Sequence, residues 1–304
     1  MGRVRRALKF ALPYGIVRAY QIAHERDALR AQLEAEHTAA PEREAAREMQ
    51  AQIERERAEE QEKAAREQTA REEAEYRDRE RKLFTENEIV YSEKRVFTFS
   101  DVPNTTFNIT GSGNVIRLND FSGGGHAYIT IQDSVRDCRI DIGENNRIFG
   151  NLFVHFYFGG GRAPNKSTIR MGDNNVVNGN LILIGGMQPG TVVSIGNENL
   201  FADNVNLIGA VDHLTYNVKT KEKYCQELGV AIRDRVWICR DTLFLNGARV
   251  GSDAIVAARS VVNKAFDDKN VLISGIPAKI TKTDVMWHLN TTDEYIFNPS
   301  PLMV

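Results

Sequence analysis

Large apolar residues recur at every sixth position in the C-terminal half of this 304-residue chain. The longest unbroken run is Ile232, Ile238, Phe244, Val250, Val256 and Val262. Usually smaller residues stand two positions before the last five of them, at Val236, Thr242, Ala248, Ala254 and Ser260. An α-helix has a period near 3.6 residues and a strand a period near 2, whereas a longer fixed period is typical of stacked repeats. The run therefore predicts a solenoid.

The same register extends upstream, so that repetition covers most of residues 100–275. Its shorter runs are Ile142, Ile148 and Val154, then Met171, Val177 and Leu183, then Ile195, Phe201 and Leu207. A single coil cannot bury its own apolar row, so the coils must stack on a shared ladder of like residues. Asn146, Asn175 and Asn199 occupy the small-residue position and are expected to form ladders or to cap turns.

The N-terminal third has a different composition. Residues 23–83 are rich in Glu, Arg, Ala and Gln, which are strong helix formers, and contain no glycine. Pairs such as Glu62 with Arg66 support an exposed helix. Large apolar residues are too sparse for a strong seam, so the segment is a loose coiled coil, a solvated single helix acting as a spacer, or partly disordered, and we favour the coiled coil. Pro41 is expected to break the helix.

Composition divides the chain into five parts. We expect a basic amphipathic segment (residues 1–22), a charged helix or coiled coil (23–83), a linker (84–99), a β-helix domain (100–280) and a C-terminal cap with a tail (281–304). A short helix over Thr281–Leu289 is expected to cover the open end of the solenoid.

The first 20 residues combine arginines with large apolar side chains. Pro13 and Gly15 interrupt the apolar part, which is too short to span a bilayer, and no small-residue cleavage site follows. Such a segment is expected to lie on the anionic inner face of the cytoplasmic membrane or to dock on another part of the protein.

Charge and cysteine content restrict the partners and the compartment. A formal net charge of -2 gives no general attraction to nucleic acid. Cys138, Cys225 and Cys239 form no CxxC pair, and an odd number without a secretory leader favours free thiols in a reducing compartment. We therefore expect a cytoplasmic protein, peripheral to the inner face of the membrane if the first 20 residues lie there.

A polar excursion that begins at Val211-Asp212-His213 interrupts the repeat once, and the chemistry is expected there. Residues 232–280, which begin IRDRVWICRD, resemble the C-terminal half of the hexapeptide-repeat acyltransferases. The excursion, VDHLTYNVKTKEK, resembles the loop of those members that O-acetylate capsular, lipopolysaccharide and sialic-acid sugars. The resemblance is strong over residues 195–285, fair over 100–194 and absent from the helical N-terminus.

The resemblance implies a mainly β fold, a left-handed parallel β-helix with a long N-terminal α-helical (coiled-coil) extension. It also implies a homotrimer that uses acetyl-CoA as acyl donor. The function expected is O-acetylation of a sugar hydroxyl on a cell-surface polysaccharide or its precursor.

Individual residues acquire roles from the same resemblance. His213 matches the histidine that acts as general base, and Trp237 is expected to help form the site for the acceptor and the thioester. Two further stretches match turns that meet the coenzyme. The turn that meets the pantetheine arm corresponds to Ala257, Ala258, Arg259, Ser260, Val261 and Val262. The turn near the phosphates corresponds to Gly275, Ile276, Pro277, Ala278 and Lys279.

Three positions in this proposed coenzyme groove depart from the family's pattern. Cys239 stands where a glycine usually follows Trp-Ile, and Ala257 and Arg259 replace small residues. Alanine is tolerated near a ligand where its dihedral angles permit it. Arg259 is either neutral or a partner for a coenzyme phosphate. Cys239, beside Arg240, is interpreted as a buried small residue in preference to a reactive thiol.

A sugar hydroxyl is a poor nucleophile at neutral pH, so a base must take its proton during the attack, and histidine is suited to that pH. Strict six-residue counting from Leu207 gives His213 an inward position, which makes Asp212 the competing outward group. For His213 to be the base, the loop must leave the register at Gly209-Ala210. Asp212 or a loop carbonyl then orients it, and backbone N–H groups stabilise the oxyanion.

Other functions are compatible with the same residues. One alternative is N-acylation of an amino sugar, and another is a catalytically degenerate scaffold whose helix spaces its partners. A zinc-dependent carbonic anhydrase of this architecture needs three converging histidines. His126, His155 and His213 lack close paired spacing, so no metal is expected.

Overall fold

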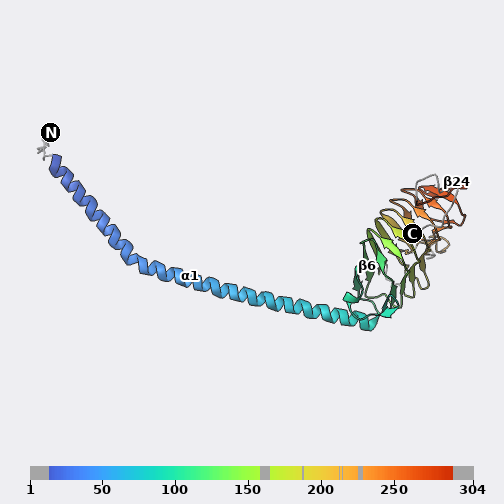
Figure 1. Cartoon of the computed structure of the whole chain (residues 1–304), viewed down its shortest axis with the longest axis horizontal. Helices are drawn as coiled ribbons and strands as arrows, with labels where there is room; N and C mark the ends of the chain where they lie inside the picture. The colour runs from blue at the N-terminus through green and yellow to red at the C-terminus, as the bar shows by residue number, and fades with distance from the viewer. Residues whose placement is uncertain are drawn as a thin grey trace. The chain divides into compact units, whose positions relative to one another are not determined.

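The computed structural model describes residues 14–157, 165–186, 188–211, 213, 215–224 and 229–289. The chain forms two compact units, the first ending at Glu75 and the second beginning at Tyr76. Helix α1 (Tyr14–Glu86) makes up the described part of the first unit and continues into the second, to which the stacked coils of β-strands belong (Figure 1).

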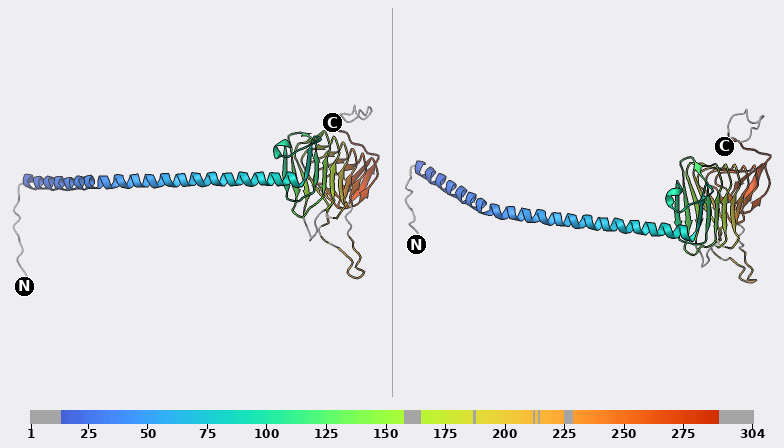
Figure 2. Two further views of the ribbon diagram at one scale, coloured as in Figure 1. Left: turned by 90° about the horizontal axis from the view of Figure 1, so that it is seen from below. Right: turned by 60° about the horizontal axis from the view of Figure 1, so that its bottom comes forward.

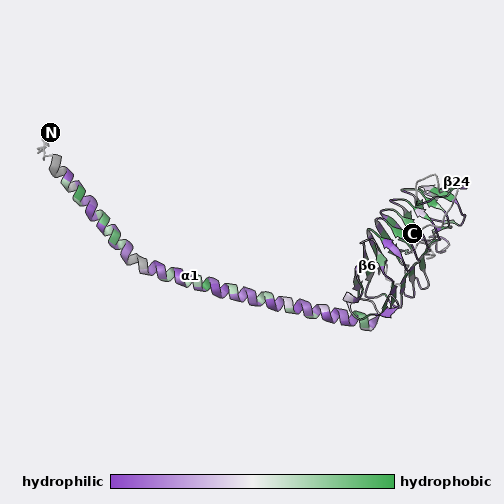
Figure 3. Cartoon of the chain, viewed as in Figure 1, coloured by the Kyte–Doolittle hydropathy of each residue, from purple (hydrophilic) through white to green (hydrophobic). Residues whose placement is uncertain are grey.

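The part of α1 in the first unit is exposed in the single chain. Every described side chain of residues 21–37 and 41–75 is exposed. Hydrophilic residues predominate along it (Figure 3), and no apolar stripe follows the helical period. Pairs one turn apart support it, such as Arg66 Nη2 to Glu62 Oε1 at 2.5 Å and Arg30 Nε to Glu34 Oε1 at 3.6 Å. The helix runs through Pro41, so the expected break there is wrong, because the remaining hydrogen bonds on both sides of the proline keep the chain helical.

None of the described helices is long and apolar enough to cross a membrane. Most of the basic segment 1–22 lies outside the described residues, so its membrane contact stays a prediction.

The last turns of α1 belong to the second unit and cover the first coil of the solenoid. Leu83 and Phe84 are buried, and the rings of Tyr76 and Phe84 each lie 5.5 Å from that of Phe99. Arg79 Nη2 donates to the Phe107 carbonyl at 3.1 Å. Residues 84–99, expected to be a linker, instead contain the end of this cap, β1 (Glu88–Tyr91) and β2 (Lys94–Arg95). The boundary therefore lies earlier in the chain than composition suggests.

The described strands form three sheets, which are the three faces of the solenoid. The first sheet has the order β2, β1, β4 (Val115–Leu118), β7 (Arg139–Ile142), β10 (Thr168–Met171), β13 (Val192–Ile195), β16 (Val230–Ile232), β19 (Arg249–Val250), β22 (Ala265–Phe266). The second has the order β24 (Ala278–Thr283), β23 (Val271–Gly275), β20 (Ile255–Val256), β17 (Trp237–Ile238), β14 (Leu200–Phe201), β11 (Val176–Val177), β8 (Asn146–Ile148), β5 (Phe121–Ser122). The third has the order β21 (Val261–Val262), β18 (Leu243–Phe244), β15 (Val205–Ile208), β12 (Asn180–Ile184), β9 (Asn151–Phe156), β6 (His126–Ile131), β3 (Thr105–Ile109). A short 3-10 turn, η1 (Phe99–Asp101), precedes β3.

Successive coils pair in parallel, so like positions lie directly above one another (Figure 2). All six large residues of the run from Ile232 to Val262 are at most 2% exposed, and the five smaller residues beside them are at 0%. The predicted parallel solenoid is therefore confirmed. Asn146, Asn175 and Asn199 form the expected ladder inside one corner, each at 1% exposure or less.

A second corner contact recurs in coils of very different length. A backbone N–H of one coil donates to a side-chain oxygen of the next. The pairs are Glu144 with Asp173, Asp173 with Asn197, Asn197 with Asp234, and Asp234 with Ser252, which lie 29, 24, 37 and 18 residues apart. Coil length thus varies without disturbing the stacking.

The C-terminal end of the solenoid is closed by a strand. β24 pairs antiparallel with β23, and the backbone N–H of Val285 donates to the Asn270 carbonyl at 3.0 Å. The helix expected over Thr281–Leu289 is therefore wrong. A helix there would leave the backbone N–H and C=O groups on the edge of β23 without partners, whereas β24 pairs with them.

Candidate functional site

The longest excursion from the described coils lies between β15 and β16. The solenoid register ends at Ile208, where the next backbone N–H, that of Gly209, still donates to the Ile184 carbonyl at 2.9 Å. Residues 215–224 form a hairpin in which Tyr216 pairs with Lys223, and the hairpin extends away from the coils (Figure 2). His213 stands at its base with an exposed side chain, as the expected departure from the register requires. Asp212 lies outside the described residues.

Trp237 lies on the second sheet with its side chain directed outward. It is 36% exposed and is aligned with Leu200 on one neighbouring strand and Ile255 on the other. Cys239 follows two residues later and is half-buried. Burial raises the pKa of the Cys239 thiol, which disfavours a reactive thiolate, but the residue is not fully buried as expected.

The turn at residues 257–260 lies on the coil that follows Cys239. The backbone N–H of Cys239 donates to the Val256 carbonyl at 2.9 Å, and that of Arg259 donates to the Arg240 carbonyl at 3.0 Å. Ser260 is buried, and its Oγ accepts the backbone N–H of Gly275 at 3.3 Å. Three successive coils thus bring together Cys239, the 257–260 turn and the start of the 275–279 turn.

The outer positions of these turns are accessible. Ala258, Arg259, Pro277 and Lys279 are exposed, and Ala257 is half-buried. Arg259 has a φ of 59°, in the left-handed region, and its side chain is 83% exposed with Nε 3.7 Å from Asp241 Oδ2. The hydrogen bond from Asn204 and the charge of Arg259 lower the pKa of the Asp241 carboxyl. The two turns and the residue that precedes Asp241 thus present the exposed cations Arg240, Arg259 and Lys279.

Several known acetyltransferases are similar to this chain. The chain is 25% identical to the galactoside O-acetyltransferase of Escherichia coli K12 over 144 residues, which are 47% of this chain and 62% of the relative. It is 31% identical over 98 residues to the putative lipopolysaccharide biosynthesis O-acetyl transferase WbbJ of the same strain, covering 30% of this chain and 50% of the relative. No family model matches. The chain thus spans under two thirds of the length of these curated relatives.

The crystal structure of the polySia specific acetyltransferase NeuO superposes with a TM-score of 0.50 at 19% identity, covering 64% of this chain and 93% of that one. This chain has the hexapeptide-repeat acyltransferase fold. The parallel β-solenoid and the long N-terminal helix expected from the sequence are therefore confirmed, whereas the coiled coil stays a prediction, and the proteins found to be similar are acetyltransferases.

A second tryptophan of this hexapeptide-repeat solenoid was missed by the sequence reasoning. Trp287 Nε1 donates to the Arg235 carbonyl at 2.8 Å, and its ring centroid lies 6.4 Å from that of Trp237. The helix expected over residues 281–289 hid this contact, since a helix there would not carry the chain back over the second sheet. The available signal was that the chain holds two tryptophans in all.

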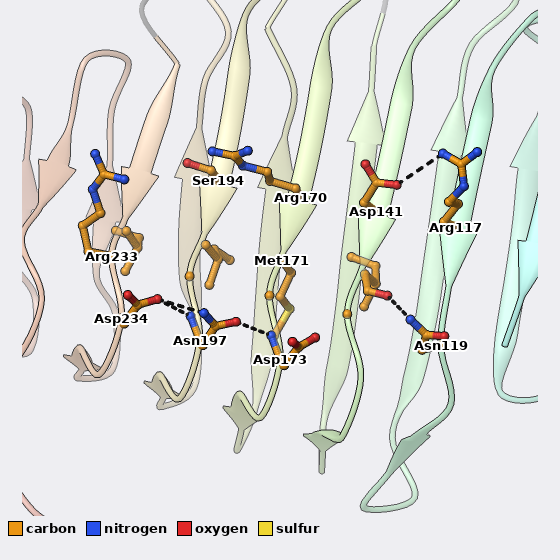
Figure 4. A pocket seen from close by; sticks show the side chains of 16 residues that line it. Arg117, Asn119, Asp141, Arg170, Met171, Asp173, Ser194, Asn197, Arg233 and Asp234 are labelled. Carbon is orange, nitrogen blue, oxygen red and sulfur yellow. Dashed lines mark hydrogen bonds and ion pairs between the residues drawn. The ribbon is translucent and has the colours of Figure 1, made fainter. Parts of the chain in front are cut away.

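The first sheet carries a polar groove of about 480 Å³ that sequence reasoning also missed (Figure 4). Side chains of both charges line it, with Arg117 3.9 Å from Asp141 and Asn197 donating to Asp234. The available signal in the sequence was a charged residue, Asp141 in RIDI and Arg170 in TIRM, directly before the last apolar residue of the strand. Its charges are balanced, and it lies on a different sheet from Trp237, so we assign it no chemistry.

Two further histidines of the solenoid have structural partners. His126 Nε2 lies 2.8 Å from Thr106 Oγ1, and His155 stacks between Phe153 and Tyr157. Burial lowers the pKa of His155. Within the part of the chain that the structure describes, no three metal-ligating side chains gather.

Proposed function

We propose that this protein is an acetyl-CoA-dependent O-acetyltransferase that modifies a sugar hydroxyl of a cell-surface polysaccharide or its precursor. The observation that carries the proposal is the exposed His213, two residues before the hairpin of residues 215–224, in an insertion between two coils of a hexapeptide-repeat solenoid. Similarity to O-acetyltransferases acting on galactosides and in lipopolysaccharide biosynthesis supports the reaction class.

In the proposed reaction His213 removes the proton of the sugar hydroxyl as its oxygen attacks the thioester carbonyl carbon. A new C–O bond forms and the C–S bond breaks when the tetrahedral intermediate collapses. The imidazolium then returns its proton to the departing sulfur, so that ester and free thiol are the products. Backbone N–H groups stabilise the oxyanion, and Asp212 or a loop carbonyl orients the imidazole.

The second sheet is the proposed place for the acyl donor. Ala257, Ala258 and Ser260 offer a turn close to Cys239, where a pantetheine arm approaches the backbone. Arg259 and Lys279 are exposed cations on that turn and on β24, which suits the phosphates of a coenzyme. Trp237 flanks the region formed by Cys239 and the 257–260 turn. Pro277 lies in the next turn, two residues before Lys279.

The assembly and location are also proposals. A homotrimer would cover the apolar outer face of the third sheet, whose half-buried outward residues include Phe153, Ile182 and Leu243. Three α1 helices would then start from one end of the trimer as a coiled coil or as separate spacers. We place the protein in the cytoplasm, with residues 1–20 on the inner face of the membrane.

Replacing His213 by alanine tests the base. Removal of a general base lowers the rate about 10²- to 10⁴-fold, so we expect thiol release from acetyl-CoA in the presence of a panel of sugars to fall by that factor. His24→Ala, on the exposed helix, is the matched control and should keep the wild-type rate. Transfer by His213→Ala near the wild-type rate would show that another group is the base.

The second candidate is a degenerate scaffold, which the side chains of Cys239, Ala257 and Arg259 in the coenzyme groove favour. The two functions differ in ligand binding. An enzyme should gain thermal stability with acetyl-CoA, by about 2.7 kcal/mol at 100 times the Kd, whereas a scaffold without the site should gain none. The third candidate is N-acylation of an amino sugar, and product analysis tests it. Hydroxylamine cleaves an O-acyl ester and leaves an N-acyl amide intact.

A further inference from the structure

The chain's two tryptophans, 50 positions apart, lie against each other on the second sheet. Their ring centroids are 6.4 Å apart and their planes are inclined at 43°, which is within the range of favourable tilted aromatic pairs. Trp237 comes from β17, inside the stack of coils, whereas Trp287 comes from the segment that follows β24.

Two attachments fix the segment that carries Trp287. β24 pairs antiparallel with β23, and the backbone N–H of Val285 donates to the Asn270 carbonyl at 3.0 Å. The indole N–H of Trp287 then donates to the Arg235 carbonyl at 2.8 Å. Arg235 is itself held by a bidentate ion pair with Asp253, at 2.6 and 3.1 Å. Trp287 is therefore tied to the corner that lies two residues before Trp237.

This contact restricts the Trp237 indole. An outward indole on a solenoid face has several staggered rotamers open to it, because no core surrounds it. The ring of Trp287 occupies one side of Trp237, and aligned neighbours Leu200 and Ile255 lie on the strands beside it. At 36% exposure Trp237 still offers a surface to a ligand.

We propose that Trp287 is a positioning residue, which holds Trp237 as the wall for the thioester end of the acyl donor. This inference rests on the proposed function. The apolar row of Leu200, Trp237 and Ile255 suits the pantetheine arm, whereas the exposed cations Arg259 and Lys279 suit the phosphates. Trp287 thus affects the binding of the donor's pantetheine arm and not the binding of its nucleotide.

Two ligands test the binding of these two ends of the donor independently. Acetyl-CoA carries the arm, and adenosine 3′,5′-bisphosphate carries phosphates but no arm. By isothermal titration calorimetry with the full chain, Trp287→Ala should raise the Kd for acetyl-CoA about tenfold and leave that for the bisphosphate within about twofold of wild type. Trp287→Phe keeps an aromatic ring and should recover most of the affinity. Met286→Ala, at a neighbouring side chain that is 74% exposed, is the matched control and should bind both ligands like wild type.

A spectroscopic readout accompanies the binding. Because both tryptophans of the chain belong to the pair, the wild-type protein should show an exciton couplet in circular dichroism that Trp287→Ala and Trp287→Phe both lose. A folded Trp287→Ala variant that binds acetyl-CoA like wild type overturns the proposal, and so does an equal loss for both ligands, which indicates general damage. Wild-type protein that binds no acetyl-CoA but shows the couplet overturns the proposed function instead.

Discussion

The side-chain amide of Asn175 donates to Oδ1 of Asn146 on the preceding coil at 3.1 Å. Asn175 is fully buried, and its own Oδ1 accepts the backbone and side-chain N–H groups of Asn199 at 3.0 and 2.9 Å. Each asparagine of this ladder therefore satisfies polar groups of two neighbouring coils at a corner that water does not reach.

Asn175→Ala should lower the free energy of unfolding by about 3 kcal/mol, since buried donors of Asn199 lose their acceptor and each unsatisfied group costs about 1–3 kcal/mol. Denaturant unfolding followed by circular dichroism measures the loss. Asn178→Ala, at an exposed side chain of the same coil, should change stability by less than about 0.5 kcal/mol. Equal losses for the two variants would contradict a special role for the ladder.

Truncation at two points tests the helical cap. A chain that begins at Tyr76 keeps the contacts of Leu83, Phe84 and Arg79 and should unfold at the full-length temperature. A chain that begins at Thr85 exposes the first coil and loses two buried apolar side chains, worth about 1.5–3 kcal/mol each. Its Tm by calorimetry should be clearly lower. The cap is unnecessary if the two truncated chains melt together.

Arg259→Gly separates backbone effects from charge. Glycine relieves the strain of the left-handed φ of 59° but gives the unfolded chain more entropy. Because these two effects roughly cancel, the free energy of unfolding should stay within about 0.5 kcal/mol of wild type. The Kd for acetyl-CoA should rise about three- to tenfold at low salt, because an exposed cation is lost, and less at high salt. Arg259→Lys should retain most of the affinity. An unchanged Kd in Arg259→Gly would make Arg259 neutral toward the coenzyme.

Cys138 gives the solenoid a measurable dependence on alkaline pH. Burial raises the pKa of its thiol from the ordinary value of 9.0 to about 11. The unfolded chain loses this proton first, so the stability that the protonated thiol contributes is complete below pH 9 and declines as pH rises toward 11, by up to about 2–3 kcal/mol. Unfolding curves of Cys138→Ala, compared with wild type across that range, should lack this part of the decline. Parallel curves for the two proteins would refute it.

Much of the solenoid follows from sequence because its core is periodic. Residues such as Ile238 and Val256 recur at a fixed spacing, and each one is buried by the equivalent residue of the next coil. The Asn146 ladder follows from the same register. His213 was expected outside the core once the loop left the register, and its side chain is exposed.

The ends of the solenoid do not follow from sequence, because non-repeating contacts determine them. The turn that contains Leu83 and Phe84 continues the pattern of an exposed helix, and contacts with residues further along the chain, such as Phe99 and Phe107, make it a cap. Trp287 was likewise expected in a helix, whereas β24 pairs with a free strand edge that only the folded coil provides.

The corner contact that joins Asp173 to Asn197 joins Asn197 to Asp234 as well, although 37 residues instead of 24 separate the second pair. The stacking of the coils therefore does not depend on the length of the segment inserted between two of them. Under the proposed function, exchange of the whole His213 loop is expected to change the acceptor preference while the stacked coils stay the same. In the proposed site, the acceptor side on this loop can therefore change separately from the donor side, which lies on the stacked coils with Trp237.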